Sequence, residues 1–140
     1  MRVVVGSDEK TALTDAVTRE LHERGHDVTL LGPLAGRTMG WASVGRELGR
    51  RVATGSADSG VLFCWTGTGA SIAANKVAGV RAALCSDAAT AAGARKWNDA
   101  NVLVMSLRST SPALADEMLD AWFSERPDPS ERENIAALES

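Results

Sequence analysis

Tyrosine is absent from the 140 residues, and histidine and cysteine occur only twice each. The two histidines, His22 and His26, fall in LHERGHDV, where we expect a helix to end before a strand, so histidine catalysis is not expected. The two cysteines, Cys64 and Cys85, have no metal-ligand spacing and imply no disulfide framework. The sequence therefore predicts reduced thiols, a cytoplasmic protein and no bound metal.

Long hydrophobic runs and strong charge are also missing. No apolar run approaches the roughly 20 residues of a transmembrane helix, and the N-terminal MRVVVGSDE lacks the apolar region of a signal peptide. The net charge of −3 argues against a nucleic acid or another polyanion as partner. The content of 44% hydrophobic and 24% charged residues is typical of a soluble globular protein, with one expected domain over residues 1–140.

Short apolar runs alternate with stretches of helical spacing along the chain, which predicts a parallel sheet with helices on both faces. The expected fold class is α/β: a three-layer α/β/α sandwich with a five-stranded, Rossmann-like parallel sheet and a C-terminal helix. Strands are expected over residues 2–6, 27–31, 60–64, 80–85 and 101–105. Helices are expected over residues 11–24, 42–54, 68–77, 87–97, 112–123 and 130–138.

The third expected strand leads into FCWTGTGASIAANK, residues 63–76, and ligands of such sheets bind at carboxyl ends of strands. The segment is not a Walker loop, and Ile72 stands where a dinucleotide fingerprint needs a small residue. It offers Cys64 before a glycine-rich turn into a helix, whose N–H groups and dipole can hold an oxyanion and favour a thiolate. Cys64 is thus a candidate base or nucleophile, with a buried apolar role as the alternative. Cys85, which lacks such a turn, is expected to be structural.

Three other polar residues have both functional and structural interpretations. Asp8 follows the first strand and can be a general base, a ligand of sugar hydroxyls or the N-cap of the first helix. Asn98 can bond a carbonyl or hydroxyl group, and Arg108 can pair with an anion. Alone, each of these residues is more often structural.

Taken together, these segments resemble the ribose-5-phosphate isomerase B / galactose-6-phosphate isomerase family of sugar-phosphate isomerases. The resemblance runs from GSD at residues 6–8 to about Trp122, and its most specific part is C-x-T-G-x-G-x-S-I-A-A-N-K over residues 64–76. The segments VRAALC and WNDANV and the arginine at position 108 follow in the expected order.

The resemblance implies a cofactor-free aldose–ketose isomerisation, in which a base moves a proton between C1 and C2 through a cis-enediolate. It implies that Cys64 is the base, that Thr66 assists proton movement at the sugar oxygens, and that Asp8 and Asn98 bind hydroxyls. Arg108 would reach an anionic end of the substrate in the partner subunit's site. The amides that would stabilise the enediolate belong to Gly67, Thr68, Gly69, Ala70 and Ser71. The implied partners are a sugar or sugar-phosphate substrate and a second copy of the chain, in a homodimer or dimer of dimers with the site at the subunit interface.

The departures from the family pattern concern phosphate binding and ring opening. Glu9 stands where the family has a histidine that helps to bind the phosphate, and Trp97 where it has the histidine credited with opening the furanose ring. Trp65 replaces the glycine after the cysteine, and Trp41 lies where the family reads D-Y-P. The family's C-terminal arginine pair is missing, unless Arg132 substitutes for one of them. We therefore expect Glu9 and these three tryptophans at the substrate, and a substrate other than ribose 5-phosphate.

The sequence leaves three functions open. The intact Cys64, Thr66 and glycine turn favour an isomerase that acts on an open-chain or unphosphorylated sugar. The two replaced histidines favour a sugar- or metabolite-binding protein without turnover on the same scaffold. A different biosynthetic reaction on that scaffold is the third. Of these, the isomerase is the preferred interpretation.

Overall fold

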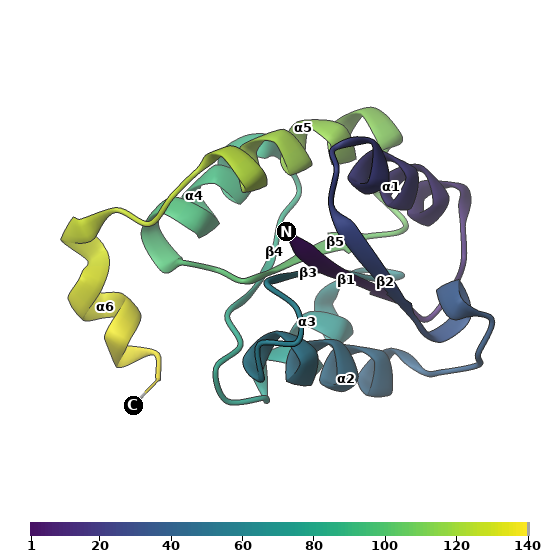
Figure 1. The fold of residues 1–140 in the computed structure, drawn as a ribbon, viewed down its shortest axis with the longest axis horizontal. Coiled ribbons are helices and arrows are strands. Elements are labelled where there is room, and N and C mark those ends of the chain that lie inside the picture. Colours follow the sequence, from purple (N-terminus) through teal and green to yellow (C-terminus); the bar gives the residue numbers. More distant parts are fainter. Residues whose placement is uncertain (140) are drawn as a thin grey trace.

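The computed structural model describes residues 1–139 and contains a five-stranded parallel sheet between two layers of helices (Figure 1). The strands are β1 (Arg2–Ser7), β2 (Asp27–Leu31), β3 (Ser59–Cys64), β4 (Ala82–Leu84) and β5 (Val102–Ser106), in the spatial order β2-β1-β3-β5-β4. The helices are α1 (Ala12–Glu23), α2 (Trp41–Ala53), α3 (Thr68–Asn75), α4 (Ala88–Asn98), α5 (Pro112–Ser124) and α6 (Arg132–Ala137), with 3-10 turns η1 (Gly32–Ala35) and η2 (Pro129–Glu131). The predicted α/β/α sandwich is confirmed.

Successive residues of each strand face opposite helix layers, as the pleat of a strand requires. Val61 and Phe63 of β3 belong to the apolar cluster formed with α1, α4 and α5. Leu62 and Cys64 belong to the cluster formed with α2 and α3, on the other face. The two layers lie on either side of the sheet in Figure 1. Cys64 therefore faces the α2–α3 layer because of its place in this alternation.

Capping side chains fix where α1 and α5 begin. Thr11 caps α1 in a reciprocal capping box with Thr14, so Asp8 is not the N-cap of that helix. Ser111 accepts a hydrogen bond from the N–H of Leu114, and Pro112 follows at the first helical position of α5.

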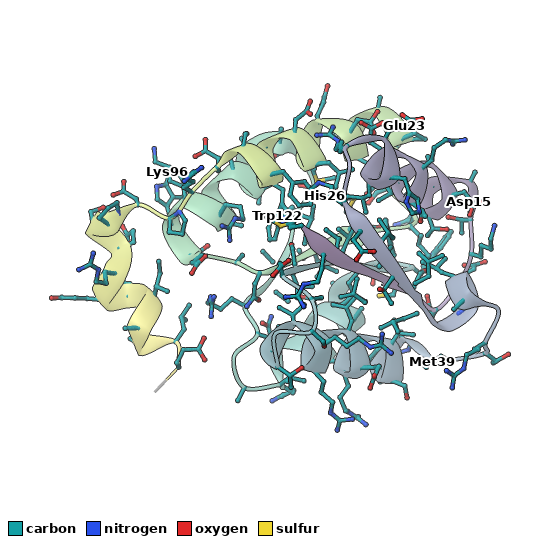
Figure 2. All side chains as sticks on the ribbon, viewed as in Figure 1. Asp15, Glu23, His26, Met39, Lys96 and Trp122 are labelled. Atoms are coloured by element: carbon teal, nitrogen blue, oxygen red, sulfur yellow. The ribbon has the colours of Figure 1, made fainter. Side chains whose placement is uncertain are left out.

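Trp122, on α5, is a core residue and lies between that helix and the sheet (Figure 2). Its indole N–H donates to the hydroxyl of Ser59, at 3.0 Å, which satisfies the one polar atom of a buried indole. The guanidinium of Arg95 lies 5.6 Å from its ring centroid. These contacts account for Trp122 without a functional role, in contrast to the three exposed tryptophans.

A glycine allows α2 and α3 to approach each other closely. A Cβ on Gly45 would lie 2.8 Å from the carbonyl oxygen of Ala70 and 2.9 Å from the Cβ of Ala73. Any larger residue at position 45 would push α2 away from α3. Trp41 lies one turn before Gly45 on the same helix, so the close approach also sets where Trp41 lies.

The fourth strand, Ala82–Leu84, is shorter than the predicted 80–85, and side-chain amides bond the backbone where it begins. Asn101 accepts from the N–H of Arg81 at 2.7 Å and donates to the carbonyl of Gly79 at 2.9 Å. Asn75 accepts from the N–H of Ala82 at 2.8 Å and donates to the carbonyl of the same residue at 2.9 Å. Asn75 and Asn101 thus hold the entry to the edge strand β4 in place.

The predicted C-terminal helix over residues 130–138 is divided into η2 and α6. Among the described residues, α6 buries none of its own, and Figure 1 shows it extending away from the sandwich beyond α4. An ion pair of 2.6 Å between Arg81 and Glu139 lies at its far end. Over residues 1–139, every helix is too short or too polar to cross a bilayer.

Candidate active site

The carboxyl ends of β1, β3 and β5 lie side by side at one edge of the sheet. Ser7 pairs with Phe63, and Cys64 pairs with Ser106. Because Asp8 directly follows β1, its side chain lies beside the end of β3. A hollow of about 280 Å³ opens at this edge. It is lined by Asp8, Trp41, Cys64, Trp65, Thr66, Thr68 and Gly69.

The turn between β3 and α3 requires glycine at position 67. Gly67 has a φ of +83°, a left-handed conformation that L-residues adopt only with strain. A Cβ there would also lie 2.5 Å from the Leu84 side chain. Gly67 is the N-cap of α3, and no side chain within residues 1–139 caps that helix. The first N–H groups of α3 therefore remain available to an anion or to a developing oxyanion in the hollow.

The backbone of the same turn is held by hydrogen bonds from the end of β5 and the residues after it. The N–H of Leu107 donates to the carbonyl of Cys64 at 3.0 Å, and that of Arg108 donates to the carbonyl of Trp65 at 2.9 Å. The hydroxyl of Ser106 donates to the same Trp65 carbonyl at 2.9 Å. These bonds hold the main chain of Trp65 and leave its side chain 58% exposed at the hollow.

Asp8 carries the one buried side-chain oxygen or nitrogen of the described residues that has no hydrogen-bond partner, its Oδ1. Its neighbours fix the loop: the hydroxyl of Ser7 donates to the carbonyl of Glu9 at 2.6 Å and accepts from the Glu9 N–H at 3.1 Å. A buried carboxylate oxygen without a donor is costly. Because Asp8 lines the hollow, its carboxylate can accept a hydrogen bond from a ligand hydroxyl there.

Two hydroxyl groups at the hollow bond to each other. The Oγ1 atoms of Thr66 and Thr68 lie 2.8 Å apart, and either can be the donor. Thr66 is thus held by a partner that is itself at the hollow. The pair can exchange its hydrogen bond for one to a bound oxygen, which is what a proton shuttle between two neighbouring sugar oxygens needs.

Of the three tryptophans predicted at the substrate, the chain brings two to the hollow. The Trp41 ring lies against Gly69, where a Cβ would be 2.8 Å from Cε3 of the indole. Trp41 and Trp65 are 49% and 58% exposed, and both line the hollow. Together they supply two apolar faces beside Cys64, which is buried. Indole faces can pack on the C–H face of a sugar and exclude water from it.

Trp97 and Asn98 lie elsewhere, because α4 runs from the carboxyl edge of the sheet back to the opposite edge. Trp97 is 55% exposed and packs on Gly93 of its own helix. Asn98 lines a separate hollow of about 420 Å³ with Arg81 and Leu138. Within one chain these two residues are not brought together with Cys64.

Glu9 and Arg108 are exposed and follow the ends of β1 and β5. Both are therefore at the carboxyl edge of the sheet in the same chain as Cys64, although neither lines the hollow itself. Ala70 and Ser71 lie in the first turn of α3, where Ala70 is fully buried and the Ser71 N–H bonds the Gly67 carbonyl at 3.1 Å. Among residues 1–139, no group of three or more His, Cys, Asp or Glu side chains is placed to hold a metal ion.

Cys85, the second buried cysteine, is held in a different environment. Burial, with a smaller contribution from the charge of Asp87, raises the pKa of the Cys85 thiol to about 12. Asp87 caps α4 by accepting from the Thr90 N–H at 2.7 Å, and hydrogen bonding with the side chain and then the backbone of Thr90 lowers the pKa of the Asp87 carboxyl. The structure therefore gives Cys85 no means of forming a thiolate near neutral pH.

Sequence reasoning did not predict the contributions of Gly45 and Asn75 to this site. Gly45 allows the helix contact that places Trp41, and Asn75 secures β4, whose Leu84 side chain lies against Gly67. The AANK motif included Asn75, but no local pattern indicated that its amide binds a backbone seven residues away.

The family model for Ribose/Galactose Isomerase matches residues 3–137. Ribose-5-phosphate isomerase B of Escherichia coli (strain K12) is 38% identical over 111 residues, 79% of this chain and 74% of that protein. D-erythrulose-4-phosphate isomerase of Pectobacterium atrosepticum is 35% identical over 125 residues, 88% of this chain and 82% of that protein. Among solved structures, ribose-5-phosphate isomerase B of Clostridium thermocellum superposes with a TM-score of 0.93 at 30% identity, over 99% of this chain and 95% of that one. The chain belongs to the ribose/galactose isomerase family of sugar-phosphate isomerases.

Proposed function

We propose that the protein is a cofactor-free aldose–ketose isomerase whose base is Cys64, acting on an open-chain sugar phosphate other than ribose 5-phosphate. The observation that carries this proposal is the hollow at the end of β3. It joins a cysteine, an uncapped helix N-terminus and the carboxylate of Asp8. A proton-transfer base, an oxyanion site and a hydroxyl ligand are the three elements that an enediolate mechanism needs.

The proposed reaction begins when the Cys64 thiolate takes the proton from the carbon beside the carbonyl group. The electron pair of that C–H bond forms the C1–C2 double bond, and the carbonyl oxygen becomes the enediolate oxyanion, held by the N–H groups at the start of α3. The Thr66 hydroxyl passes a proton between O1 and O2. The Cys64 thiol then returns its proton to the other carbon, which regenerates the thiolate and completes the isomerisation. Asp8 accepts a hydrogen bond from a substrate hydroxyl and fixes its orientation.

One feature favours a substrate that needs no ring opening. Trp97 stands where the family has the histidine credited with ring opening, and an indole cannot transfer the protons that this step requires. A tetrose phosphorylated at O4 has no hydroxyl from which to form a furanose, so it is always open-chain. One relative is named D-erythrulose-4-phosphate isomerase, which adds support for a four-carbon substrate.

We also propose that residues 1–140 act as one domain in a cytoplasmic homodimer or dimer of dimers, with the site at the subunit interface. Trp97 and Asn98 lie at the opposite edge of the sheet from Cys64, so within the assembly they would serve the partner's site. The α6 helix buries none of its own residues among those described, as expected of an element that packs on another copy.

The decisive experiment measures solvent deuterium at C1 and C2 by NMR. Erythrulose 4-phosphate, ribulose 5-phosphate and unphosphorylated erythrulose are each incubated with the protein in heavy water. We expect deuterium incorporation with the tetrulose phosphate and its loss in Cys64→Ala. Absence of exchange with every sugar, or undiminished exchange in Cys64→Ala, would disprove the proposal. A ligand-dependent change in tryptophan fluorescence without exchange would instead favour the sugar-binding function.

The shared site has its own test. Cys64→Ala and Asn98→Ala chains are each expected to be inactive alone. Mixed after partial unfolding and refolding, they form hybrids in which one site has both native residues, so part of the activity returns. If mixing restores nothing although size-exclusion chromatography shows hybrids, the subunits do not share the site.

A further inference from the structure

A second hollow, of about 420 Å³, lies beside the edge strand β2 and shares no lining residue with the hollow at Cys64. We call it the arginine groove. One wall is the end of β2 with η1 and the following loop, which contributes Arg37 and Met39; Figure 2 labels Met39 beside α2. The other wall is a polar stripe of α2, whose residues 46, 47, 50 and 51 share one helix face.

The groove concentrates positive charge on a protein of net charge −3. Four of the twelve arginines line it, namely Arg37, Arg46, Arg50 and Arg51, against one carboxylate, Glu47. Of these four arginines, only Arg51 has an ion-pair partner among the described residues, the Glu47 carboxylate at 3.3 Å. The overall charge had argued against a polyanionic ligand, but it hides this local excess.

The structure supplies a reason for some of these charges and not for others. Arg50 and Arg51 lie in the last turn of α2, where the helix dipole favours cations. Arg46 lies in the middle of the helix, one turn before Arg50, so the two like charges repel. Arg37 lies in a loop and has no carboxylate within 4.0 Å among residues 1–139. Neither Arg37 nor Arg46 therefore has an ion pair or a helix-end position that would explain its charge.

The chemistry of the groove matches a phosphorylated organic molecule. Guanidinium groups bind phosphate oxygens in pairs and are always charged, so three of them without ion-pair partners can hold two phosphate groups. Met39 and the apolar end of β2 offer a surface for an organic group. The hollow has the volume of a small-molecule site.

We propose that the arginine groove is a binding site for an organic diphosphate, separate from the catalytic hollow. The ligand class is a molecule with two linked phosphate groups, which Arg37, Arg46 and Arg50 contact, and an organic part that lies on Met39. This proposal does not rest on the proposed isomerase activity. Binding there would act on α2, whose first residue, Trp41, lies over Gly69 in the catalytic hollow.

The test is isothermal titration calorimetry with ADP, inorganic pyrophosphate and AMP as probes. We expect saturable binding at one site per chain, in the order ADP, then pyrophosphate, then AMP. Affinity for ADP is expected to fall at least about tenfold in Arg46→Ala/Arg50→Ala and to weaken as salt rises. Alanine is a good helix former, so this double variant keeps its fold, which circular dichroism and thermal unfolding verify.

The matched control is Arg19→Ala/Arg126→Ala, which removes the same charge from exposed positions on α1 and in the C-terminal segment and should leave ADP binding unchanged. Cys64→Ala should also bind ADP normally, which separates this site from the catalytic one. No saturable binding of any probe, or equal losses in the two double variants, would overturn the proposal. Loss of ADP binding in Cys64→Ala would overturn it as well, since the probe would then occupy the catalytic hollow.

Discussion

The ends of β3 and β4 are alike in sequence and opposite in chemistry. Each strand leads to a buried cysteine, Cys64 or Cys85, and then through a short turn into a helix. At α4 the N-terminus is satisfied by the chain itself, because Asp87 accepts from the Thr90 N–H. At α3 the N-cap is Gly67, and no side chain of the described residues takes the corresponding place.

The comparison shows what turns a common α/β element into a site. A helix N-terminus carries partial positive charge and unpaired N–H groups wherever it occurs. A carboxylate at the N-cap uses them for stability, whereas a glycine leaves them for a ligand. The cysteine beside the self-capped helix has its pKa raised to about 12 by burial and by the Asp87 charge. The cysteine beside the uncapped helix lines a hollow with polar groups.

The largest expected difference between the two strand ends is catalytic. Cys64→Ala should lower the rate of deuterium exchange into the substrate by about 10²–10⁴-fold, the usual contribution of a general base. Cys85→Ala should leave exchange unchanged and produce a modest loss of stability through lost packing. The two rates are measured by NMR at equal concentrations of folded protein. Equal losses in both variants would mean that cysteine removal acts through the fold and not through chemistry.

The second prediction concerns the turn itself. Gly67→Ala places a Cβ against the Leu84 side chain at a φ of +83° and should cost about 1–3 kcal/mol in the free energy of unfolding. It should also reduce exchange, because the N–H groups of α3 shift. The control is Gly36→Ala, with a φ of +77° and nothing within 4 Å of the new Cβ. Urea unfolding of both variants separates strain from contact, and equal losses would show that the Leu84 contact contributes nothing.

The sequence was sufficient to place Asp8 and Cys64 at the same edge. Parallel strands direct all their carboxyl ends one way, and the residues after β1 and β3 lie there regardless of detail. The same topology explains why Trp97 and Asn98 are distant. The 11 residues of α4 span about 16 Å, enough to carry the chain from the carboxyl edge back to the amino edge. The family resemblance assigned Asp8, Cys64, Trp97 and Asn98 to one site. It did not show whether one chain or two chains supply them.

The parts that could not be predicted depend on contacts between distant side chains. The start of β4 is held by the amides of Asn75 and Asn101, which bond backbone groups that a periodic pattern assigns to the strand. The position of Trp41 over Gly69 requires the close helix approach at Gly45. Neither periodicity nor capping rules carry information about such contacts.

A third prediction tests the self-capped helix. Asp87→Ala removes the acceptor for the Thr90 N–H and should cost about 1 kcal/mol in the free energy of unfolding. Exchange should not change, since Asp87 is not part of the hollow at Cys64. Asp87→Asn, which keeps an N-cap acceptor without the charge, should recover most of the stability in urea unfolding. If Asp87→Ala reduces exchange with little loss of stability, the ends of the two strands are coupled and the comparison fails.

The smallest expected effect is a change of stability at high pH caused by the Cys85 thiol, and it is absent at neutral pH. Its pKa is about 12 in the folded chain, against an ordinary value of 9.0, so above about pH 9 the unfolded chain releases this proton and the folded chain keeps it. The unfolded state then binds fewer protons, and stability must decline as pH rises from 9 toward 11. Cys85→Ala removes this contribution, so its stability relative to the parent should improve over that range.

Urea unfolding of both proteins at pH 7, 9 and 10.5 measures the difference, with Cys64→Ala as the matched control. A Cys85→Ala curve parallel to that of the parent would show that the thiol ionises in the folded chain, and that the two strand ends differ less than their geometry implies.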